Sequence, residues 1–555
     1  MEAIKEIQKE VRSRQILAMI VYALIQMTSL ITPYLMGVII DDYIPNQDIF
    51  HIIVGIALFV AIPMMTILLQ TIYQYFKFVY LRKKGNEIAL RVMKNLVYQK
   101  KNFFDQQNSM ELLSYCSKEA TGYLQFYVSE MSQFYVNIFV AVVVFLVLLW
   151  MNPQIALLQL LYYPIAYLPT RFIMKNIDKI IQRILSLNAE LNQIKGDIFQ
   201  AIELVKLARL EEKKLDEVNE KNEAVNAIWG RVAALDSLTG AWSNAFTSVL
   251  FKGITFGIGA LLIISFGQNL QVGQLVSIIT YAGIFYASVN SVIMTKVMDQ
   301  KKTSEYEKLF SFLELSGEKE EEEKKAPFSL QEEIRFTDCC FRYDSQEDWV
   351  LQHMDLRFKA GSWTGIVGPS GQGKSTVLDI ILKLYPVEDG SVFIDDVDIN
   401  RINAFSIRDH ITKIAQDVFL FPGTIEENLK LMREGITEVE IWEALRFACL
   451  DDYVRELPQG IRTDVGEAGK LMSGGERQRL SIAMGLLRGN KILMLDEITS
   501  NLDLSLEERL ADHFQELVQS GYTIISISHR LSFLKYAQDV YEMREGKAQL
   551  QRDMP

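Results

Sequence analysis

The chain has 555 residues, of which 49% are hydrophobic and 23% are charged, and its mean hydropathy is +0.11. This composition excludes both a purely water-soluble enzyme and a bundle of membrane helices alone, so two kinds of domain must share the chain. The formal net charge of −12 argues against a nucleic-acid partner, because phosphate backbones recruit basic surfaces.

Six apolar runs in the first half of the chain are long enough to cross a bilayer, which takes about 20 residues each. Each run contains a few polar residues, which favours a bundle with a lined interior over six separate anchors. We therefore expect a membrane α-helical bundle over residues 1–315. The six runs lie near residues 16–40, 52–76, 128–150, 154–174, 245–267 and 273–295.

Lysine and arginine placement predicts the orientation of these spans. The connections 41–51, 151–153 and 268–272 contain neither residue, whereas 82–118 and 171–231 are rich in both. Since cytoplasmic loops carry the excess of positive charge, both termini are expected to face the cytoplasm. The two positively charged connections contain few helix breakers, so the spans should continue as helices into the cytosol. The four cysteines show no metal-ligand spacing, and a reducing compartment is the simplest inference.

The second half of the chain has a different pattern. An acidic run, Glu318 to Glu323 with one lysine, predicts a solvated linker within residues 316–327. From 328 to 555, short β-branched runs alternate with helical patterns, which is typical of an α/β domain.

The stretch GPSGQGKST, residues 368–376, has the spacing of a phosphate-binding loop. A short buried strand, Trp363 to Val367, precedes it and an apolar helix follows, which is the order that this loop requires. Glycines let backbone amides close around phosphate oxygens, Lys374 would supply charge to the β and γ phosphates, and Ser375 would hold Mg²⁺. The predicted nucleotide-binding residues here are Gly368, Pro369, Ser370, Gly371, Gln372, Gly373, Lys374, Ser375 and Thr376.

Two further segments carry chemistry of the same kind. KILMLDE, residues 491–497, is a buried strand that ends in two carboxylates, which predicts Asp496 as a Mg²⁺ ligand and Glu497 as the group that polarises an attacking water. In MSGGERQR, Ser473 holds an N-cap position and Gly474 and Gly475 open a helix, so this helix end is a second candidate for binding an anion.

These motifs, in this order, resemble the ATP-binding cassette (ABC) exporters of the half-transporter type, in which six spans precede one nucleotide-binding domain with a P-loop ATPase fold. FFDQQNSMELLS and LVKLARLEEKKL resemble the two cytosolic segments that dock on nucleotide domains. The remaining motifs are CFRYD with Tyr343, IAQD with Gln416, TDVGE at 463–467, SNLD at 500–503 with Asp503, and SHRLS with His529.

The resemblance also implies roles for these residues. Tyr343 would stack on adenine, Gln416 would contact the metal and the catalytic site, and His529 would be the switch histidine. Asp503 and the segment Ser473, Gly474, Gly475 and Glu476 would complete the nucleotide site, with ATP and Mg²⁺ as ligands.

For the whole chain, the resemblance implies an ATPase that drives export of an amphipathic drug, lipid or peptide. The chain would work as a homodimer or heterodimer with a second half-transporter, in contact with membrane lipid at the plasma membrane, with its nucleotide-binding domain in the cytoplasm. The alternatives are an importer of exporter-like fold and an ATP-gated channel or sensor.

The sequence departs from the family pattern at a few positions. The usual LSGGQ reads MSGGE, from Met472 to Glu476, and its serine and glycines are retained. Met110 stands where the docking segment usually has glycine, and Asn501 replaces the usual alanine of SALD.

The best candidate for a substrate contact is Lys252, deep in the fifth apolar run. A lysine at that depth is a site hypothesis by default, and the alternative is that its ammonium reaches the head groups of the inner leaflet.

Overall fold

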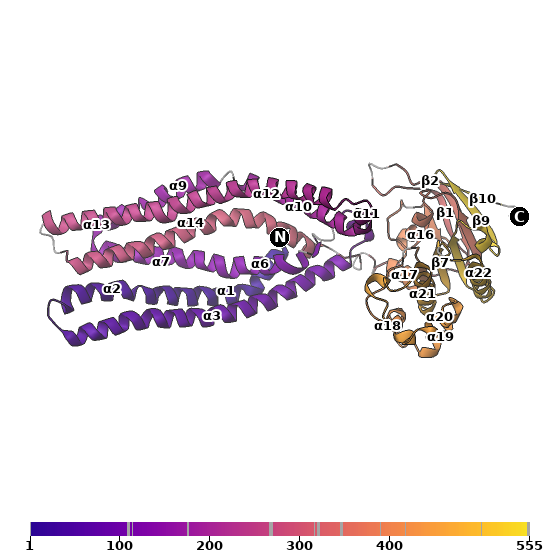
Figure 1. Cartoon of the computed structure of the whole chain (residues 1–555), viewed down its shortest axis with the longest axis horizontal. Helices are drawn as coiled ribbons and strands as arrows, with labels where there is room; N and C mark the ends of the chain where they lie inside the picture. The colour runs from indigo at the N-terminus through magenta and orange to yellow at the C-terminus, as the bar shows by residue number, and fades with distance from the viewer. Residues whose placement is uncertain are drawn as a thin grey trace. The chain divides into compact units, whose positions relative to one another are not determined.

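The structure is a computed structural model. It describes residues 2–107, 112–113, 115–174, 177–265, 270–315, 317–318, 322, 324–344, 348–388, 390–416, 418–500 and 502–551. The chain forms two compact units: unit 1 is Met1–Asn95 with Met110–Leu315, and unit 2 is Leu96–Ser109 with Ser316–Pro555. The expected helical half and the expected α/β half are both present (Figure 1).

Unit 1 is helical over most of the residues that the structure describes. One-turn π-helices and short helices interrupt its long helices, as is common where a helix must be re-aimed. The long elements are α1 (Glu2–Ser29), α2 (Ile31–Val38), α3 (Ile49–Val97), α7 (Met131–Met151), α8 (Pro153–Gln159), α9 (Tyr162–Met174), α10 (Ile177–Gln200), α12 (Glu211–Gly240), α13 (Thr247–Ser265) and α14 (Val272–Glu314). The short ones are η1 (Ile39–Tyr43), η2 (Tyr115–Glu119), α6 (Ala120–Leu124), η3 (Gln125–Glu130), α11 (Ile202–Leu207) and η4 (Ala241–Phe246).

Five helical stretches in the described part of the chain are long and apolar enough to cross a membrane. They correspond to five of the six expected spans. The other expected span, near 154–174, is divided between α8 and α9 by a turn at Leu160 and Leu161. Because α8 has 7 residues and α9 has 13, neither is long enough alone, and a sixth span stays a prediction. The five stretches are Ile4–Tyr43, Ile49–Val97, Ala120–Met151, Thr247–Ile264 and Val272–Lys296.

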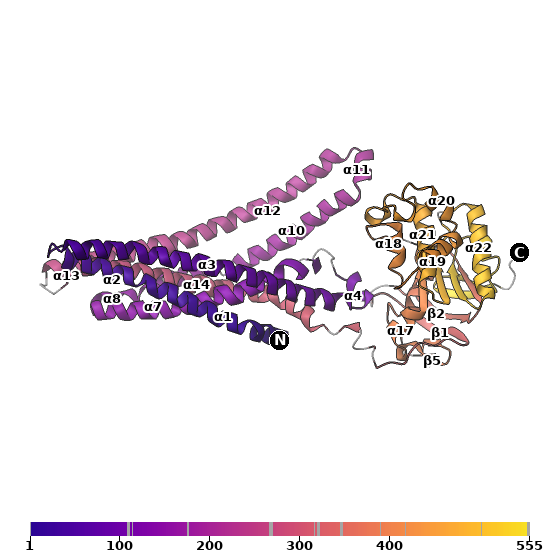
Figure 2. The same cartoon turned by 90° about the horizontal axis from the view of Figure 1, so that it is seen from below.

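Several helices of unit 1 are much longer than a membrane is thick. α3 has 49 residues and α14 has 43. At 1.5 Å per residue they measure about 73 and 65 Å, against a hydrocarbon core of about 30 Å. The expectation of helical continuation into the two positively charged connections is confirmed by α3, which runs to Val97, and by α10 and α12. α10 and α12 pack on one another and are joined through α11, and Figure 2 shows this pair diverging from the other helices of the unit.

Buried polar side chains hold the helices of unit 1 together. Tyr286 of α14 donates a hydrogen bond to Gln159 of α8, which in turn donates from Nε2 to Thr255 Oγ1 of α13 at 3.1 Å. Asn290 of α14 donates to Tyr162 Oη of α9 at 2.8 Å. In an apolar surrounding such bonds act between helices because the polar groups have few alternative partners.

Unit 2 contains two β-sheets and the helices that cover them. A six-stranded sheet has the order β10-β9-β3-β8-β7-β6, in which β9, β3, β8, β7 and β6 are parallel. An antiparallel sheet has the order β2-β1-β4-β5. The strands are β1 (Glu333–Phe341), β2 (Leu351–Lys359), β3 (Trp363–Val367), β4 (Val392–Ile394), β5 (Val397–Asp398), β6 (Ile411–Ile414), β7 (Ile492–Asp496), β8 (Thr523–Ile527), β9 (Asp539–Arg544) and β10 (Lys547–Gln551).

The helices of unit 2 follow individual strands or fill the space between them. The central strands β7 and β8 are buried along their whole length, as a parallel sheet covered on both faces requires. The helices are α4 (Lys101–Asp105), α16 (Lys374–Ile381), α17 (Ala404–His410), α18 (Ile425–Lys430), α19 (Glu438–Phe447), α20 (Asp451–Glu456), α21 (Gly474–Leu487) and α22 (Leu504–Gln519).

The acidic run at 318–323 differs from the expected solvated linker. Glu318 and Glu322 are only 6% and 2% exposed. Glu318 accepts two hydrogen bonds from the Arg408 guanidinium, at 2.8 and 2.9 Å, and Glu322 forms ion pairs with Lys325 and Lys383. The solvated reading is therefore wrong for these two carboxylates, because basic side chains of unit 2 draw them into its surface.

Candidate active site

The predicted catalytic residues meet at one edge of the six-stranded sheet. The glycine-rich loop follows β3, His529 follows β8, Asp496 and Glu497 end β7, and Gln416 follows β6. Since β3, β8, β7 and β6 are parallel neighbours, their carboxyl ends lie side by side. Ligands of α/β sheets bind at such an edge.

The loop after β3 needs glycine at two positions for reasons of space and of backbone conformation. Gly368 has a φ of 144°, and a Cβ there would lie 2.3 Å from the carbonyl oxygen of Met543. Gly373 has a φ of 83°, and a Cβ would lie 2.8 Å from Leu351 Cδ2. The Gln372 side chain fixes the loop from outside by accepting a hydrogen bond from the Glu545 backbone at 2.6 Å. Ser370 and Gly371 are exposed at its tip.

Lys374 lies inside this loop. Its Nζ donates to the carbonyl oxygens of Gly368 and Pro369, at 2.9 and 2.8 Å, and lies 3.9 Å from Glu497 Oε1. Burial lowers the pKa of Lys374, and the charges of Glu497 and Asp496 oppose that shift. The ammonium is therefore held where phosphate oxygens could replace the two carbonyl groups.

Glu497 is fixed from both sides. Its Oε2 accepts a hydrogen bond from Gln416 Nε2 at 3.0 Å, and its Oε1 lies 2.9 Å from His529 Nε2. His529 Nε2 also lies 3.4 Å from Lys374 Nζ. The three residues predicted as catalytic, Glu497, His529 and Gln416, thus form one hydrogen-bonded group beside the loop lysine, and the carboxylate is placed to accept a proton.

Asp496 is the second carboxylate of the site. Its Oδ1 accepts a hydrogen bond from Ser375 Oγ at 2.9 Å, and its Oδ2 forms an ion pair with Lys413 Nζ at 3.1 Å. Ser375 and Asp496 present the hard oxygen ligands that Mg²⁺ prefers, and they contact one another directly. Gln416, the third predicted ligand, joins the group through its Nε2 contact with the neighbouring Glu497.

Two other predicted residues lie on the far side of the loop helix. Tyr343 is exposed, and its hydroxyl is 2.8 Å from Thr376 Oγ1 of α16. The edge of its ring meets Tyr385, with ring centroids 5.0 Å apart. This arrangement leaves Tyr343 accessible for a planar base while its hydroxyl is tied to the phosphate-binding helix.

The segment from Ser473 to Glu476 builds the start of α21. Ser473 Oγ accepts from the Glu476 backbone at 3.3 Å, and Glu476 Oε2 accepts from the Ser473 backbone at 2.7 Å. This reciprocal capping box explains how glutamate replaces the usual glutamine. Gly474 and Gly475 form the first turn, and Ser473 is exposed.

Asp503 caps a helix as well. Its Oδ1 accepts from the Leu506 backbone at 2.9 Å at the start of α22, and this bond holds the pKa of Asp503 below its ordinary value. Its predicted contact with nucleotide stays a prediction. Asn501 and Met110, two of the departures from the family pattern, lie outside the described residues.

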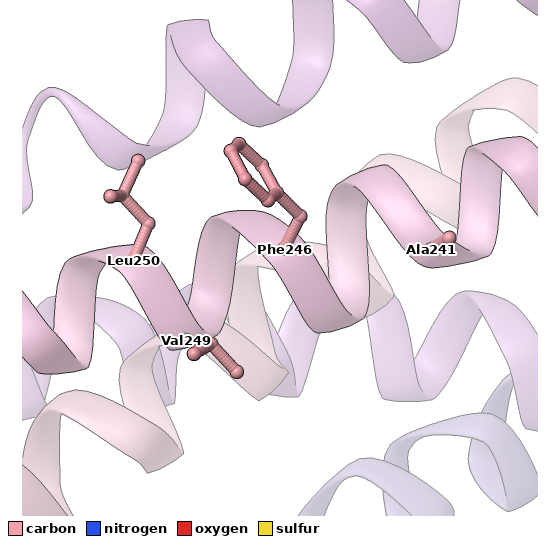
Figure 3. Close-up of a pocket in the computed structure, with 4 residues that line it drawn as sticks. All are labelled: Ala241, Phe246, Val249 and Leu250. Atoms are coloured by element: carbon pink, nitrogen blue, oxygen red, sulfur yellow. The ribbon is translucent and has the colours of Figure 1, made fainter.

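Lys252 lies on α13 beside α14. Its side chain is exposed, and a methyl group added at Gly283 would lie 3.4 Å from its Cε and 3.6 Å from its Nζ. An apolar hollow of about 500 Å³ lies on the same stretch of chain, lined by Ala241, Phe246, Val249 and Leu250. Figure 3 shows Phe246 and Leu250 on one side of this helix and Val249 on the other. At 100° per residue, Lys252 is about 160° from Leu250, so the two do not share a face.

Sequence motifs did not identify two charged residues of this site, Lys413 and Asp379. Lys413 lies in β6 and contacts both Asp496 and Asp379 of α16, the latter at 2.8 Å. Burial tends to lower the pKa of Lys413, but its bonds to the two carboxylates raise it above the ordinary value. One lysine in a short apolar strand carries no motif, so only the strand order reveals its position.

Comparison with known proteins agrees with this geometry. The ABC transporter transmembrane region family model matches residues 15–289, and the ABC transporter family model matches residues 351–500. An uncharacterized ABC transporter ATP-binding protein of Sinorhizobium fredii is 28% identical, over 93% of this chain and 87% of its own. The ATP-dependent lipid A-core flippase of Desulfotalea psychrophila is 27% identical, over 93% of this chain and 89% of its own.

A solved structure has the same fold over nearly the whole length. The structure of a bacterial Atm1-family ABC exporter with ATP bound matches with a TM-score of 0.84 and 22% identity, covering 97% of this chain and 94% of its own. Helices long and apolar enough to span a membrane and an ABC ATPase domain lie in one polypeptide. The chain therefore belongs to the ABC transporter family, as a multi-pass half-transporter that joins one transmembrane domain to one ATP-hydrolysing domain.

Proposed function

We propose that this chain is one half of a dimeric ATP-driven exporter that moves an amphipathic substrate out of the cytoplasm or the inner leaflet. The observation that carries the proposal is the intact group of Lys374, Glu497, His529 and Gln416 in a chain that also carries membrane-spanning helices. The exporter-type fold and the similarity to a lipid flippase support the direction and the substrate class.

The residues of the site fit ATP with Mg²⁺. Gly368 and Gly373 keep the loop open to a close approach by phosphate, and Lys374 would bind the phosphate oxygens. Ser375, Asp496 and Gln416 would hold Mg²⁺, which neutralises charge on the β and γ phosphates when it is bound. Tyr343 would stack on the base, with Pro369, Ser370, Gly371, Gln372 and Thr376 completing the loop.

Within this site, Glu497 would accept a proton from the attacking water. Its carboxylate is oriented by Gln416 on one oxygen and His529 on the other, so it need not reorganise before the reaction. The neighbouring Lys374 would stabilise charge that develops on the phosphate. These roles require the water to lie within hydrogen-bond reach of Glu497 in the loaded protein.

A second chain would complete each ATP site. The first turn of α21 offers exposed Ser473 and two glycines, suited to an anion presented by another molecule. Unit 1 likewise exposes Leu204 and Leu207 of α11, at 61% and 77%, which suits docking on a partner. A homodimer is possible because this chain keeps both halves of the site, and a heterodimer with a second half-transporter is the alternative.

Transport into sealed vesicles tests the proposal. The reconstituted protein, with its nucleotide domain on the outside, should accumulate a fluorescent amphipathic probe against a gradient when Mg-ATP is added. The matched control is Glu497→Gln. If the probe instead accumulates only in vesicles whose nucleotide domain is on the inside, the protein is an importer of the same fold. An ATP-dependent leak of probe without accumulation would identify a channel.

Lys252 is our candidate for recognising an anionic group on the substrate. The side chain lies beside α14, and no carboxylate among the described residues forms an ion pair with it. A lysine so placed in a membrane helix would be costly unless it served a ligand. Lys252→Met should weaken stimulation of ATP hydrolysis by anionic amphiphiles and leave stimulation by neutral ones unchanged. If Lys252→Cys reacts only with lipid-phase reagents and transport is normal, the lysine is a lipid anchor instead.

A proposed location accompanies this function. The chain would reside in the plasma membrane with both termini and the nucleotide domain in the cytoplasm, as the distribution of basic residues predicts. Protease accessibility of the C-terminus in right-side-out and inverted vesicles measures this orientation directly.

A further inference from the structure

Lys413 joins the predicted metal ligand to a second carboxylate. Its Nζ lies 3.1 Å from Asp496 Oδ2 and 2.8 Å from Asp379 Oδ1, and the side chains of all three residues are largely buried. Asp496 uses its other oxygen to accept from Ser375. One ammonium is therefore shared between the site that would hold Mg²⁺ and a carboxylate on the opposite side of the lysine.

Asp379 in turn contacts the segment Leu96–Ser109, which packs as part of unit 2. Lys101 Nζ of α4 lies 3.6 Å from Asp379 Oδ2, so Lys413 and Lys101 each approach a different oxygen of one carboxylate. The two lysines compete for the same negative charge. Lys413 is 18% exposed and Lys101 is 43% exposed, so the outer contact is the weaker one.

A second contact ties the same segment to the base-binding side of the nucleotide site. Asp105 accepts a hydrogen bond from Tyr385 Oη at 2.6 Å, and the Lys101 ammonium lies 5.0 Å above the Tyr385 ring. Tyr385 also packs edge-on against Tyr343. The segment therefore reaches Tyr343 through one intermediate side chain, Tyr385, and reaches Asp496 through two, Asp379 and Lys413.

We propose that Lys413 is a positioning residue that reports occupation of the Mg²⁺ site to the segment 96–109, by moving its charge between Asp496 and Asp379. A divalent charge near Asp496 repels the Lys413 ammonium and takes over its carboxylate. The ammonium then bonds more strongly to Asp379 and weakens the hold of Asp379 on Lys101. The segment is the direct continuation of α3, so a change in its docking is delivered to a helix of unit 1.

This inference rests on the proposed nucleotide site. It predicts an effect of removing the Lys413 charge that differs from the effect of removing a lysine with only a structural role. Coupling between two sites is reciprocal, so Lys413 must oppose the binding of Mg²⁺ if binding displaces it. Removing the charge should therefore tighten divalent binding. A lysine that served only to hold the carboxylates in place would give weaker binding when it is removed.

The first measurement is divalent affinity. Mn²⁺ is titrated by electron paramagnetic resonance into the full-length protein, reconstituted in nanodiscs and saturated with a non-hydrolysable ATP analogue. Lys413→Met should bind Mn²⁺ more tightly by about three- to tenfold, as expected for one neighbouring charge in a partly screened site. Lys413→Arg, which keeps the charge, should stay near wild type. Lys430→Met, which removes a surface lysine of unit 2, is the matched control.

The second measurement follows the segment itself. A nitroxide at Gln106→Cys, in a background with Cys116→Ser and Cys340→Ser, reports the mobility of exposed residue 106. In wild type, addition of Mg²⁺ to protein already loaded with the analogue in EDTA should increase that mobility. Lys413→Met should lose this magnesium-dependent step and retain any change caused by the analogue alone.

The outcomes separate this inference from the proposed function. Unchanged or weaker Mn²⁺ binding in Lys413→Met, or a wild-type mobility step in that variant, overturns the relay. If Lys413→Met does not fold, Lys101→Met removes the outer contact instead. It should abolish the mobility step and, by the same reciprocity, should tighten Mn²⁺ binding, by less than Lys413→Met because Lys101 is the more exposed lysine. A mobility step that persists in Lys101→Met overturns the relay as well. Neither readout depends on transport, so failure of export leaves both tests valid.

Discussion

Glu497 occupies a backbone conformation that glutamate seldom adopts. Its φ is 51°, in the left-handed region, which costs of order 1 kcal/mol or more for a residue with a Cβ. The conformation is held by a backbone hydrogen bond from Glu497 to Ile527 and by the two side-chain partners of the carboxylate. Such strain turns the carboxylate away from Asp496 and toward Gln416 and His529.

We expect Glu497→Gln to bind ATP normally and to hydrolyse it 10² to 10⁴ times more slowly, about the loss seen when a general base is removed. The amide preserves the shape of the side chain but cannot accept a proton. The measurement is single-turnover hydrolysis together with binding of a fluorescent ATP analogue. Glu508→Gln, on the exposed face of α22, is the control. Wild-type turnover in Glu497→Gln would remove this carboxylate from catalysis.

At the residue scale, the sequence predicts those side chains that a short motif places at the end of a strand. Lys374, Ser375, Asp496 and Glu497 fall into this class, because loop spacing and strand burial determine where they point. Lys413 and Asp379 do not. Lys413 reaches Asp496 because β6 lies next to β7 in the sheet, and it reaches Asp379 because α16 packs beside β6; no local pattern encodes either neighbour.

At the scale of elements, the first turn of α21 combines helix capping with the predicted binding of a partner's nucleotide. We expect Glu476→Gln to keep ATP hydrolysis, because the amide oxygen can accept the same hydrogen bond from the Ser473 backbone as the carboxylate does. Glu476→Ala should lower the stability of the domain by about 1 kcal/mol, the usual cost of a lost cap, and should slow hydrolysis. Thermal unfolding and steady-state hydrolysis measure both effects. Equal behaviour of the two variants would show that the capping box has no role.

The packing of Glu322 within unit 2 is a second feature of this scale. Glu322 is buried between Lys325 and Lys383 and accepts a hydrogen bond from the Ala404 backbone at 2.9 Å. Burial lowers the pKa of Lys383 to about 8, although Glu322 opposes that shift. Composition alone predicts a solvated linker, because the sequence does not show which basic side chains lie next to these carboxylates in the folded domain.

Glu322→Gln should therefore lower the free energy of unfolding of unit 2 by about 3 kcal/mol, since it leaves Lys383 without its buried counter-charge. The matched control is Glu426→Gln, which breaks the exposed pair with Lys430 and should cost less than about 1 kcal/mol. Thermal unfolding of the purified protein, followed by fluorescence, compares the two. Equal shifts would mean that the buried pair is as weak as a surface pair.

The membrane helices show how far hydropathy alone predicts where helices begin and end. Hydropathy locates five helices that are long enough to cross a membrane, and the abundance of helix formers in 82–118 correctly predicts that α3 continues past its apolar run. The region 154–174 is equally apolar, yet a turn at Leu160 and Leu161 divides it. Pro164 follows that turn and cannot donate to the carbonyl oxygen of Leu160, four residues earlier, so the break has a local cause that hydropathy does not register.

At the scale of the whole molecule, one chain carries one phosphate-binding loop and one exposed α21 N-terminus. In the proposed dimer, each site would draw its loop and its α21 from different chains. A mixed dimer of Lys374→Ala and Ser473→Arg chains should then have one intact site and one doubly damaged site. Differently tagged chains allow the mixed dimer to be isolated, and trapping of nucleotide with vanadate counts the working sites. Mixed dimers that trap no nucleotide would contradict this assembly.

The inclusion of Leu96–Ser109 in unit 2 bears on how the protein can be divided for study. A fragment that begins at Ser316 would lack Asp105 and Lys101, so the hydroxyl of the buried Tyr385 would lose its acceptor and Asp379 would lose one of its two lysines. In such a fragment, water would contact the Tyr385 hydroxyl and the Asp379 carboxylate, which residues 96–109 cover in the intact chain. The nucleotide-binding unit is therefore built from two separate stretches of the chain. An isolated nucleotide domain that keeps the native contacts needs residues 96–109, supplied as a second peptide or joined through a linker.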